Sequence, residues 1–298
     1  MESHVQRLVD QTWDKFQKCD ASQRLLIAIS GIPGSGKTTL AASVCAGLNK
    51  AYHKHNHERY PNSPDRSRPD IAFVVPLDGY HLTRKQLSEM PNAEEAVFRR
   101  GAAFTFDPQS YLKLVEKIRK PISPESRTIY APSFDHAVKD PVANDISIPP
   151  TARIIIFEGL YTALDEPGWR EANALMDETW FVDADIPTAT ERVAKRNYAA
   201  GISSSYEESL DRTEKSDMRN AREVLEKRLP VQEIVSSVED ESWRSEEVDN
   251  MEKSLKKMED NGIEVDVDDD DDDEADLRKQ RMSRMDSIAM LAADGVGM

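Results

Sequence analysis

The chain contains very little cysteine: Cys19 and Cys45 are the only two among 298 residues. They form no C-x-x-C pair, which argues against a disulfide framework and against a zinc site. The sequence also lacks any run of about 18 apolar residues, the length that a membrane-spanning helix requires. We therefore expect a protein of a reducing, cytoplasmic compartment with no membrane partner, the nucleus being the alternative location.

Basic residues are scarce at the end of the chain, where acidic residues accumulate. From Glu239 onward there are 21 acidic and 8 basic residues, so this segment holds −13 of the net charge of −16. The preceding residues are nearly neutral, and an acidic chain of this kind is not expected to bind nucleic acid. The run VDVDDDDDDEAD (265–276) repels itself and cannot form a core. We predict one folded domain over 1–238 and an acidic, largely disordered tail over 239–298, either solubilising or binding a basic partner.

The pattern of apolar residues predicts an α/β fold. An amphipathic helix is expected within 1–23, without the apolar core of a signal peptide. Short apolar runs typical of buried strands alternate with helical patterns, which include 187–200 and 206–228. The strand runs cover 24–30, 71–75, 127–131, 153–157 and 179–183. This alternation predicts a three-layer α/β/α domain with a mainly parallel sheet.

Several local signals predict where helices begin. Thr83 with Gln86, and Asn92 with Glu95, have the spacing of capping boxes, and Asp107 precedes a proline at a first helical position. The polar stretch 53–70 reads as a surface loop. Its alternating histidines, His53, His55 and His57, are read as solvated, because no Cys or carboxylate nearby completes a zinc ligand set.

A phosphate-binding motif follows the first predicted strand. GIPGSGKT (31–38) matches G-x-x-x-x-G-K-[S/T], with an apolar strand before it and an amphipathic helix after it. Glycines let backbone N–H groups surround an anion, and the helix amino terminus adds a positive dipole end. Lys37 is expected on the β- and γ-phosphates, and the Thr38 hydroxyl on Mg²⁺. The predicted ATP-binding residues here are Gly31, Pro33, Gly34, Ser35, Gly36, Lys37, Thr38 and Thr39.

The guanine-recognition signal of GTPases is missing. The only Asn-Lys pair, Asn49-Lys50, is followed by Ala51-Tyr52 and does not continue as Asn-Lys-x-Asp. Modules that a motor ATPase would use to bind partners are also not visible. Phosphoryl transfer from ATP to a small acceptor is the remaining interpretation.

Two carboxylates are predicted at the same edge of the sheet as this motif. Asp78 follows the strand 71–75, and Glu158 ends the strand 153–157. Ligands of open α/β sheets bind at the carboxyl ends of the strands, so both should face the phosphate site. Asp78 would orient an acceptor hydroxyl and take its proton late, and Glu158 would support Mg²⁺. The alternatives are a tight Asp-Gly turn for Asp78 and a strand-end capping role for Glu158.

Five segments in this order resemble the uridine kinase/phosphoribulokinase/pantothenate kinase family of P-loop kinases, and most closely its fungal uridine-kinase-like members. They are GIPGSGKTTL, PLDGYHLTR, RRGAAFTFDP, YAPSFDHAVKDP and IIIFEGLY, within residues 24–238. The resemblance implies a parallel sheet, an ATP-Mg²⁺ site and an acceptor-orienting Asp at position 78. It also implies an acceptor pocket made by Tyr80, His81, Arg99, Arg100, Phe106, Asp107, Tyr130 and His136.

Some of these residues have a structural alternative. Asp107 can serve as a helix cap, Tyr130 as a packing residue, and Arg99 and Arg100 as cations at a helix end. Arg192 and Arg196 resemble the arginines of a lid that closes over ATP, and their spacing places both on one helix face, where they could also be solvated.

The resemblance leaves the acceptor open. Uridine kinases usually carry Asp-Ser-Phe-Tyr where this chain has Asp78-Gly79-Tyr80-His81, which is closer to pantothenate kinases. We expect a kinase that phosphorylates a hydroxyl of a nucleoside, with pantothenate or a sugar as alternatives, and a homo-oligomer is possible. The alternative from another class is a nucleotide-switched interaction protein that uses the acidic tail.

Overall fold

The structure, a computed structural model, describes residues 2–60, 68–135 and 137–238. The predicted tail and His136 lie outside these residues. Within them, no helix is both long enough and apolar enough to cross a membrane.

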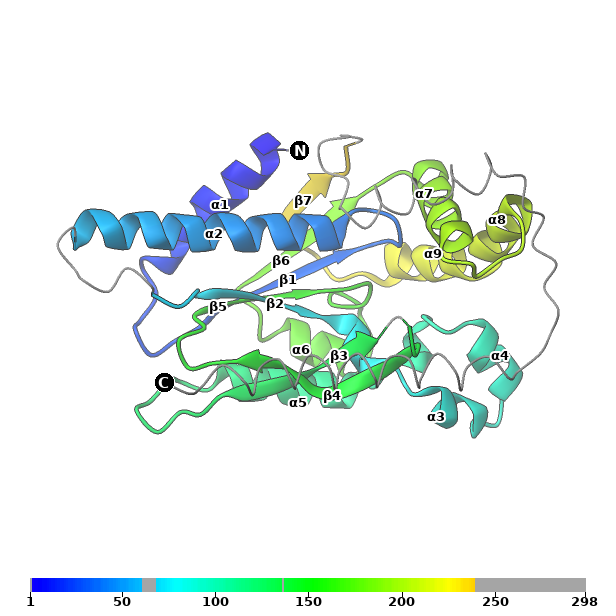
Figure 1. Ribbon diagram of the computed structural model, residues 1–298, viewed down its shortest axis with the longest axis horizontal. Coiled ribbons are helices and arrows are strands. Elements are labelled where there is room, and N and C mark those ends of the chain that lie inside the picture. The colour runs from blue at the N-terminus through cyan, green and yellow to red at the C-terminus, as the bar shows by residue number, and fades with distance from the viewer. Residues whose placement is uncertain (1, 61–67, 136, 239–298) are drawn as a thin grey trace, which may run out of the picture. The chain divides into compact units, whose positions relative to one another are not determined.

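A parallel sheet of five strands forms the centre of the domain (Figure 1). Its order is β2-β5-β1-β6-β7, with β1 Leu25–Gly31, β2 Ala72–Pro76, β5 Ile154–Glu158, β6 Glu178–Asp183 and β7 Glu233–Ser236. Every residue of β1 and β5 is buried, as their unbroken apolar sequences predict for strands covered on both faces. The predicted α/β fold with a mainly parallel sheet is confirmed; β7 was not predicted from the sequence.

Alternate residues of the strands pack into two separate cores. On one face, α1 (Glu2–Phe16) and α2 (Lys37–Arg59) cover Leu25, Ile27 and Ile29. On the other face, α5 (Pro108–Arg119) and α6 (Trp169–Asn173) cover side chains such as Ile155 and Phe157. The sheet is therefore the middle of three layers, and its strand ends are the places where polar side chains can reach a ligand.

One predicted strand lies outside this sheet. Residues 127–131 were expected in the parallel sheet, but β3 (Ile129–Asp135) pairs only with the antiparallel β4 (Asp140–Ile148). Ile129 and Ala131 are buried while Tyr130 is exposed, so β3 is covered on one face only. One-sided burial is typical of antiparallel pairs and not of a central parallel strand. β3 and β4 therefore form an antiparallel hairpin outside the central sheet.

The helices lie close to their predicted positions, with three differences. The predicted helix 206–228 is two helices, α8 (Tyr206–Lys215) and α9 (Asp217–Lys227), separated at Ser216, a turn residue whose φ of −117° and ψ of −71° are distorted from regular helix. The expected loop 53–70 begins as helix, since α2 continues to Arg59; His53 Nε2 donates to Asp70 Oδ1 at 2.8 Å. Asn92 makes no side-chain cap for α4 (Ala93–Phe98), so that predicted box is wrong.

The other two predicted helix starts are confirmed. Thr83 forms a complete capping box with Gln86 at α3 (Arg84–Ser88). The Asp107 side chain accepts from the Ser110 backbone N–H at 2.9 Å at the start of α5. The remaining helix is α7 (Ile186–Ala199), and two short 3₁₀ turns, Leu77–Tyr80 and Ala103–Thr105, lie between β2 and α5.

Candidate active site

The glycine-rich loop joins β1 to α2, as the sequence predicts. Gly36 precedes the first turn of α2 with a φ of 90°, a conformation that glycine adopts without strain. The first turn of α2 carries no acidic residue, so nothing there opposes an anion at the helix amino terminus. At Gly34 a Cβ would lie 2.6 Å from the Ala189 carbonyl oxygen, which shows that α7 packs directly against this loop.

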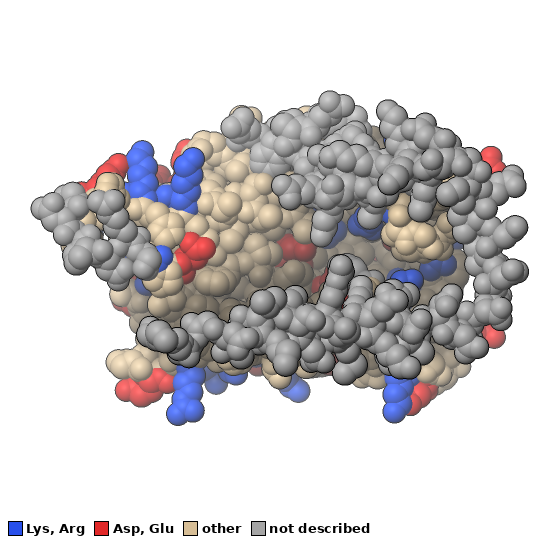
Figure 2. Space-filling model, in the orientation of Figure 1, with Lys and Arg blue, Asp and Glu red and all other residues tan. Residues whose placement is uncertain are grey.

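Sheet order places the two predicted carboxylates beside the loop. β5 lies between β1 and β2, and Glu158 at its end is in register with Ile29 and with Pro76. Asp78 follows Pro76 within the turn Leu77–Tyr80. Since neighbouring strands are about 4.8 Å apart, the loop, Glu158 and Asp78 meet at one edge. Figure 2 shows this end of the molecule hollowed, with basic and acidic side chains on its walls.

Thr38 and Glu158 form the contact on which a metal site would be built. The Thr38 hydroxyl lies 3.3 and 3.2 Å from the two carboxylate oxygens of Glu158. Burial raises the pKa of Glu158, and the Lys37 ammonium opposes that rise. A hydroxyl next to a carboxylate is an oxygen donor set that suits Mg²⁺ when phosphate oxygens and water complete the shell. The residues present therefore fit the ion that the sequence motif implies.

Lys37 lies among the charges of the site. Burial lowers the pKa of this lysine, while Glu158 and Asp78 raise it, and Arg196 lowers it further. Both predicted carboxylates and one of the two predicted lid arginines are thus close enough to act on the Lys37 ammonium. The site thus combines the Lys37 ammonium, which can bind an anion, with two carboxylates, of which Glu158 is buried and Asp78 is exposed.

Asp78 is the solvent-facing carboxylate of the pair. Its side chain is 52% exposed, whereas Glu158 is buried. The adjacent His81 ring is held by Nδ1 at 2.8 Å from the Asp78 carbonyl oxygen, and stacks on Phe106 with ring centroids 3.9 Å apart. Tyr80 points instead into the core, against Tyr111 at 5.4 Å. Of these side chains only Asp78 is exposed; His81 is 11% exposed and packs between Phe106 and Phe134, and Tyr80 supports the turn from the core.

Gly79 is required by the close approach of the β3–β4 hairpin to this turn. A Cβ at position 79 would lie 2.2 Å from the Pro132 carbonyl oxygen. The Ser found here in uridine kinases would therefore push the hairpin away from Asp78. The hairpin therefore forms one wall beside Asp78.

We expect Gly79→Ser to lower the free energy of unfolding by about 1–3 kcal/mol, since the added atoms overpack a backbone contact. Urea denaturation of the purified chain measures the change. Gly201→Ala is the control, because a Cβ there meets nothing within 4 Å and only its φ of 66° opposes the side chain. A Gly79→Ser variant no less stable than this control would contradict a fixed hairpin.

Arg99 and Arg100 both make structural contacts in this structure. Arg99 is buried, and its Nη2 donates to Asn220 Oδ1 on α9 at 2.7 Å. Arg100 Nη2 donates to Asp140 Oδ1 at 2.8 Å and so ties the hairpin to the segment before it. These contacts give both arginines a structural role between distant segments, and their contact with an acceptor stays a prediction.

We expect Arg99→Met to lower the free energy of unfolding by about 1.5–3 kcal/mol, because it removes a charge-assisted hydrogen bond and leaves buried Asn220 unpaired. Chemical denaturation tests this, with Arg84→Met as the control, since the Arg84 side chain is 62% exposed. If stability is unchanged and only the KM for the acceptor rises, Arg99 is a ligand contact.

The other predicted acceptor residues occupy three different environments. Phe106 is buried and packs edge-on against Tyr161 at 5.3 Å. Asp107 caps α5, as its alternative reading predicted. Tyr130 is 53% exposed on β3, so it is not a core packing residue. Of the two aromatic side chains, Phe106 is therefore buried and Tyr130 faces solvent.

The predicted lid arginines lie on α7, against the phosphate loop. Arg192 Nη1 donates to the Gly34 carbonyl oxygen at 3.2 Å and to Ser237 Oγ at 2.9 Å. Arg196 acts on Lys37 and on Asp217, whose pKa is raised by burial and lowered by Arg196 and Arg212. Arg192 therefore binds the loop itself, and the charge of Arg196 acts on Lys37.

Sequence reasoning missed Asp217, because 206–228 was read as one helix. The available signal was the pair Ser216-Asp217, two residue types that favour helix starts over helix interiors. Its neighbour Arg212 lies over the Phe98 ring at 5.6 Å, so α8 also touches α4. The charges around Lys37 are thus linked through Arg212 of α8 to helix α4.

The fold and this site together define a P-loop kinase. No protein-family model matches the chain. The "ATP-dependent kinase-like protein notR'" of Aspergillus versicolor is 44% identical over 176 residues, which are 59% of this chain and 100% of that protein. The "Putative uridine kinase C227.14" of Schizosaccharomyces pombe is 38% identical over 213 residues, 72% of this chain and 83% of that protein.

A solved structure supports the same fold. That of YFH7 from Saccharomyces cerevisiae matches with a TM-score of 0.68 at 24% identity, over 79% of this chain and 99% of that one. The chain belongs to the family of uridine-kinase-like, ATP-dependent P-loop kinases that these relatives represent. The resemblance noted in the sequence is confirmed.

Proposed function

We propose that the protein transfers the γ-phosphoryl group of ATP to a hydroxyl of a small molecule, most simply a nucleoside. The observation that carries this proposal is the sheet order, which sets Glu158 between the phosphate loop and Asp78. One carboxylate is buried against Thr38 for a metal, and the other is exposed to an acceptor.

Each residue then has a defined task. The backbone of residues 31–38 and the Lys37 ammonium bind the β- and γ-phosphates. Thr38 and Glu158 would hold Mg²⁺, which when bound neutralises charge on the phosphates. Asp78 accepts a hydrogen bond from the acceptor hydroxyl, aligns its oxygen with the γ-phosphorus and takes its proton late. Arg196 stabilises negative charge on the transferring group, and Arg192 holds the loop.

The nucleoside is supported by the printed name of the S. pombe relative. The segment Asp78-Gly79-Tyr80-His81 argues for keeping pantothenate and sugars as alternatives, because the buried Gly79 contact excludes the Ser of uridine kinases.

The test is release of ADP from ATP-Mg²⁺ in the presence of nucleosides, pantothenate, sugars and sugar phosphates, one at a time. We expect one class to stimulate release at least tenfold and to yield a phosphorylated product by mass spectrometry. If ATP binds measurably but none of these compounds stimulates ADP release, the protein is not a kinase for any of them. That result would favour the nucleotide-switched interaction protein.

A further inference from the structure

Asp217, the first residue of α9, is a carboxylate to which the proposed function gives no task. Arg196 of α7 and Arg212 of α8 both lower its pKa, against the rise that burial causes. The Asp217 carboxylate is thus close to guanidinium groups from two other helices. It also raises the pKa of Lys37, which Arg196 lowers. Asp217 therefore belongs to the charges around the phosphate site, although it is distant from Lys37 in the sequence.

The three helices that carry these residues pack together. Helix α8 packs against both α7 and α9 (Figure 1). The Ser209 hydroxyl of α8 donates to the Ala194 carbonyl oxygen of α7 at 2.8 Å, and both residues are buried. Helix α7 itself lies against the phosphate loop at Gly34. A carboxylate at the start of α9 can therefore hold an arginine of α7 in a fixed place relative to the phosphates.

An arginine that acts on a transferring phosphoryl group gains from being held in advance. A free arginine side chain has many conformations, and selecting one of them costs entropy. An ion pair with Asp217 restricts Arg196 before the reaction, which is the advantage of a preorganised site. The guanidinium has five N–H donors, so a bond to Asp217 leaves others for phosphate oxygens.

The second partner, Arg212, connects Asp217 to the acceptor side of the molecule. Its guanidinium carbon lies 5.6 Å from the centre of the Phe98 ring, at the last residue of α4. The next residue, Arg99, donates from Nη2 to Asn220 Oδ1 of α9 at 2.7 Å. Asn220 lies three residues after Asp217, on the same side of that helix. Two consecutive residues of the acceptor side thus contact α8 and α9.

The same segment is bonded to the chain that follows the Asp78 turn. Arg100 Nη2 donates to the Leu82 carbonyl oxygen at 2.9 Å. The Leu82 backbone N–H donates to the Thr105 carbonyl oxygen at 2.8 Å. Residues 98–105 therefore bridge the space between the Asp78 turn and the helices that carry Arg212 and Asn220.

We propose that Asp217 is a positioning residue that holds Arg196 at the phosphate site. Through Arg212 it also links Arg196 to Phe98 on the acceptor side. The inference rests on the proposed function and deepens it. An acceptor that orders residues 98–105 also orders Arg212 and, through Asp217, Arg196. The arginine is then best placed when both substrates are bound, which favours transfer to the acceptor over transfer to water.

The first test measures acceptor-stimulated ADP release by the Asp217→Asn variant. We expect kcat to fall about tenfold while the KM for ATP changes less than about twofold, because Arg196 acts on the transition state more than on bound ATP. Asp217→Glu, which restores the charge, should recover most of kcat. Asparagine also favours helix starts, so the variant should fold with an unchanged melting temperature.

Asp211→Asn is the control for this test, because Asp211 is an exposed residue of α8 that pairs with Lys215. Its kcat should equal that of the unaltered protein. A kcat of Asp217→Asn within about twofold of this control would overturn the inference. An equally low kcat in Asp217→Glu would also overturn it, since the charge would then not be what matters.

The second test examines the link through Arg212. Arg212→Met should lower acceptor-stimulated kcat about fivefold, because Asp217 loses its contact with the acceptor side. The double variant with Asp217→Asn should be no slower than Asp217→Asn alone, since both changes break one link. Losses that multiply in the double variant would overturn the link to Phe98.

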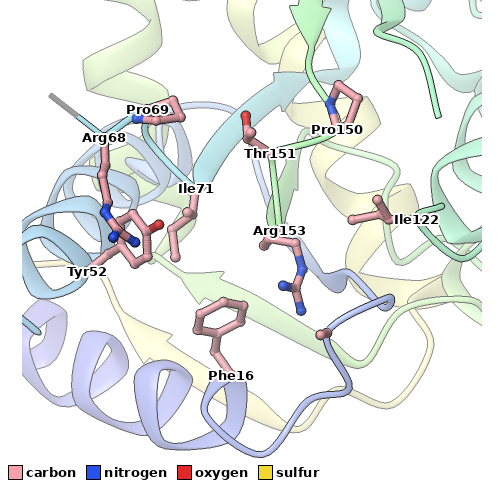
Figure 3. Close-up of a pocket in the computed structure, with 10 residues that line it drawn as sticks. Phe16, Tyr52, Arg68, Pro69, Ile71, Ile122, Pro150, Thr151 and Arg153 are labelled. Atoms are coloured by element: carbon pink, nitrogen blue, oxygen red, sulfur yellow. The ribbon is translucent and has the colours of Figure 1, made fainter. Parts of the chain in front are cut away.

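Arg68→Met is the matched control for Arg212→Met. The Arg68 guanidinium carbon lies 5.2 Å from the centre of the Tyr60 ring, so the variant also removes an arginine from an aromatic ring. Arg68 lines a separate hollow of about 480 Å³ with Ile71 and Arg153, the residues that precede β2 and β5 (Figure 3). It is therefore at the amino ends of these strands, and its variant should keep full activity.

A binding experiment separates this inference from the proposed function. Calorimetry measures the affinity for Mg-ADP with aluminium fluoride, which mimics a planar phosphoryl group, and for Mg-ADP alone. Arg196→Met and Asp217→Asn should each weaken only the fluoride complex, by about tenfold, and the double variant should equal Arg196→Met. This result without any stimulating acceptor would remove the acceptor reaction and keep the role of Asp217. Stimulation by an acceptor with independent effects of the two variants would keep the kinase and overturn the inference.

Discussion

The Asp78→Asn variant should lose acceptor-stimulated ADP release by a factor of about 10²–10⁴, while its affinity for ATP changes less than threefold. Asparagine keeps the shape of the side chain, but it cannot accept a proton from the acceptor hydroxyl. Asp78 is half exposed and its carboxylate lies 4.0 Å from His81 Nδ1, so the substitution leaves the core intact. The measurement is ADP release with the best acceptor, alongside ATP binding by calorimetry.

Asp183→Asn is the matched control for this variant. Asp183 also ends a strand of the parallel sheet, β6, and is exposed, but it lies on the other side of β1 from β5. Its variant should retain activity within twofold. If Asp78→Asn retains activity as well, another group aligns the acceptor, and the assignment of Asp78 fails although the kinase assignment stands.

The Lys37→Met variant should lose at least 10³-fold in kcat/KM and bind ATP at least tenfold more weakly. Methionine has a similar volume but no charge, so the β- and γ-phosphates lose a cation in a partly desolvated site, where such contacts are strongest. Glu158 also loses the ammonium that opposes the rise in its pKa. Protonated Glu158 would hold Mg²⁺ poorly, which adds to the loss.

Lys50→Met provides the comparison, since Lys50 is an exposed residue of the same helix α2. Steady-state kinetics over a range of Mg²⁺ and ATP concentrations separates the two effects of Lys37→Met. A higher Mg²⁺ requirement would reveal the change at Glu158. An Lys37→Met enzyme with normal kcat/KM would show that the loop does not hold the transferred phosphate.

The sequence predicted the parts of the site that local patterns encode. The phosphate loop has a fixed spacing, and Asp78 and Glu158 each end an apolar run, so their shared edge follows from the geometry of a parallel sheet. The middle position of β5 could not be predicted, because strand order depends on packing between segments far apart in the chain. The same limit applies to Arg99, whose partner Asn220 is 121 residues away.

Local sequence patterns gave wrong predictions where the same residue types suit two different structures, such as a polar loop and the end of a helix. The helix α2 continues through His53, His55 and His57 to Arg59, and the His55 ring packs edge-on against Trp13, so the first polar residues of the expected loop are its last turns. Residues 206–228 kept a helical period across Ser216, so the break and Asp217 were hidden. Tyr80 and His81 follow the exposed Asp78 directly, yet Tyr80 is buried in the core and His81 is covered by Phe106 and Phe134, which the polar sequence did not indicate.

The order β2-β5-β1-β6-β7 also determines how the protein acquires its activity during folding. Each strand that carries a site residue pairs with a strand distant in the chain; Leu25 pairs with Ile154, about 130 residues later. Pairing over such separations closes long loops and is slow. We therefore expect the phosphate loop and Asp78 to reach their relative positions only when β5 pairs with both of their strands. Recovery of ATP binding after dilution from urea should therefore follow the slowest phase, with the same rate constant as burial of Trp180 in β6.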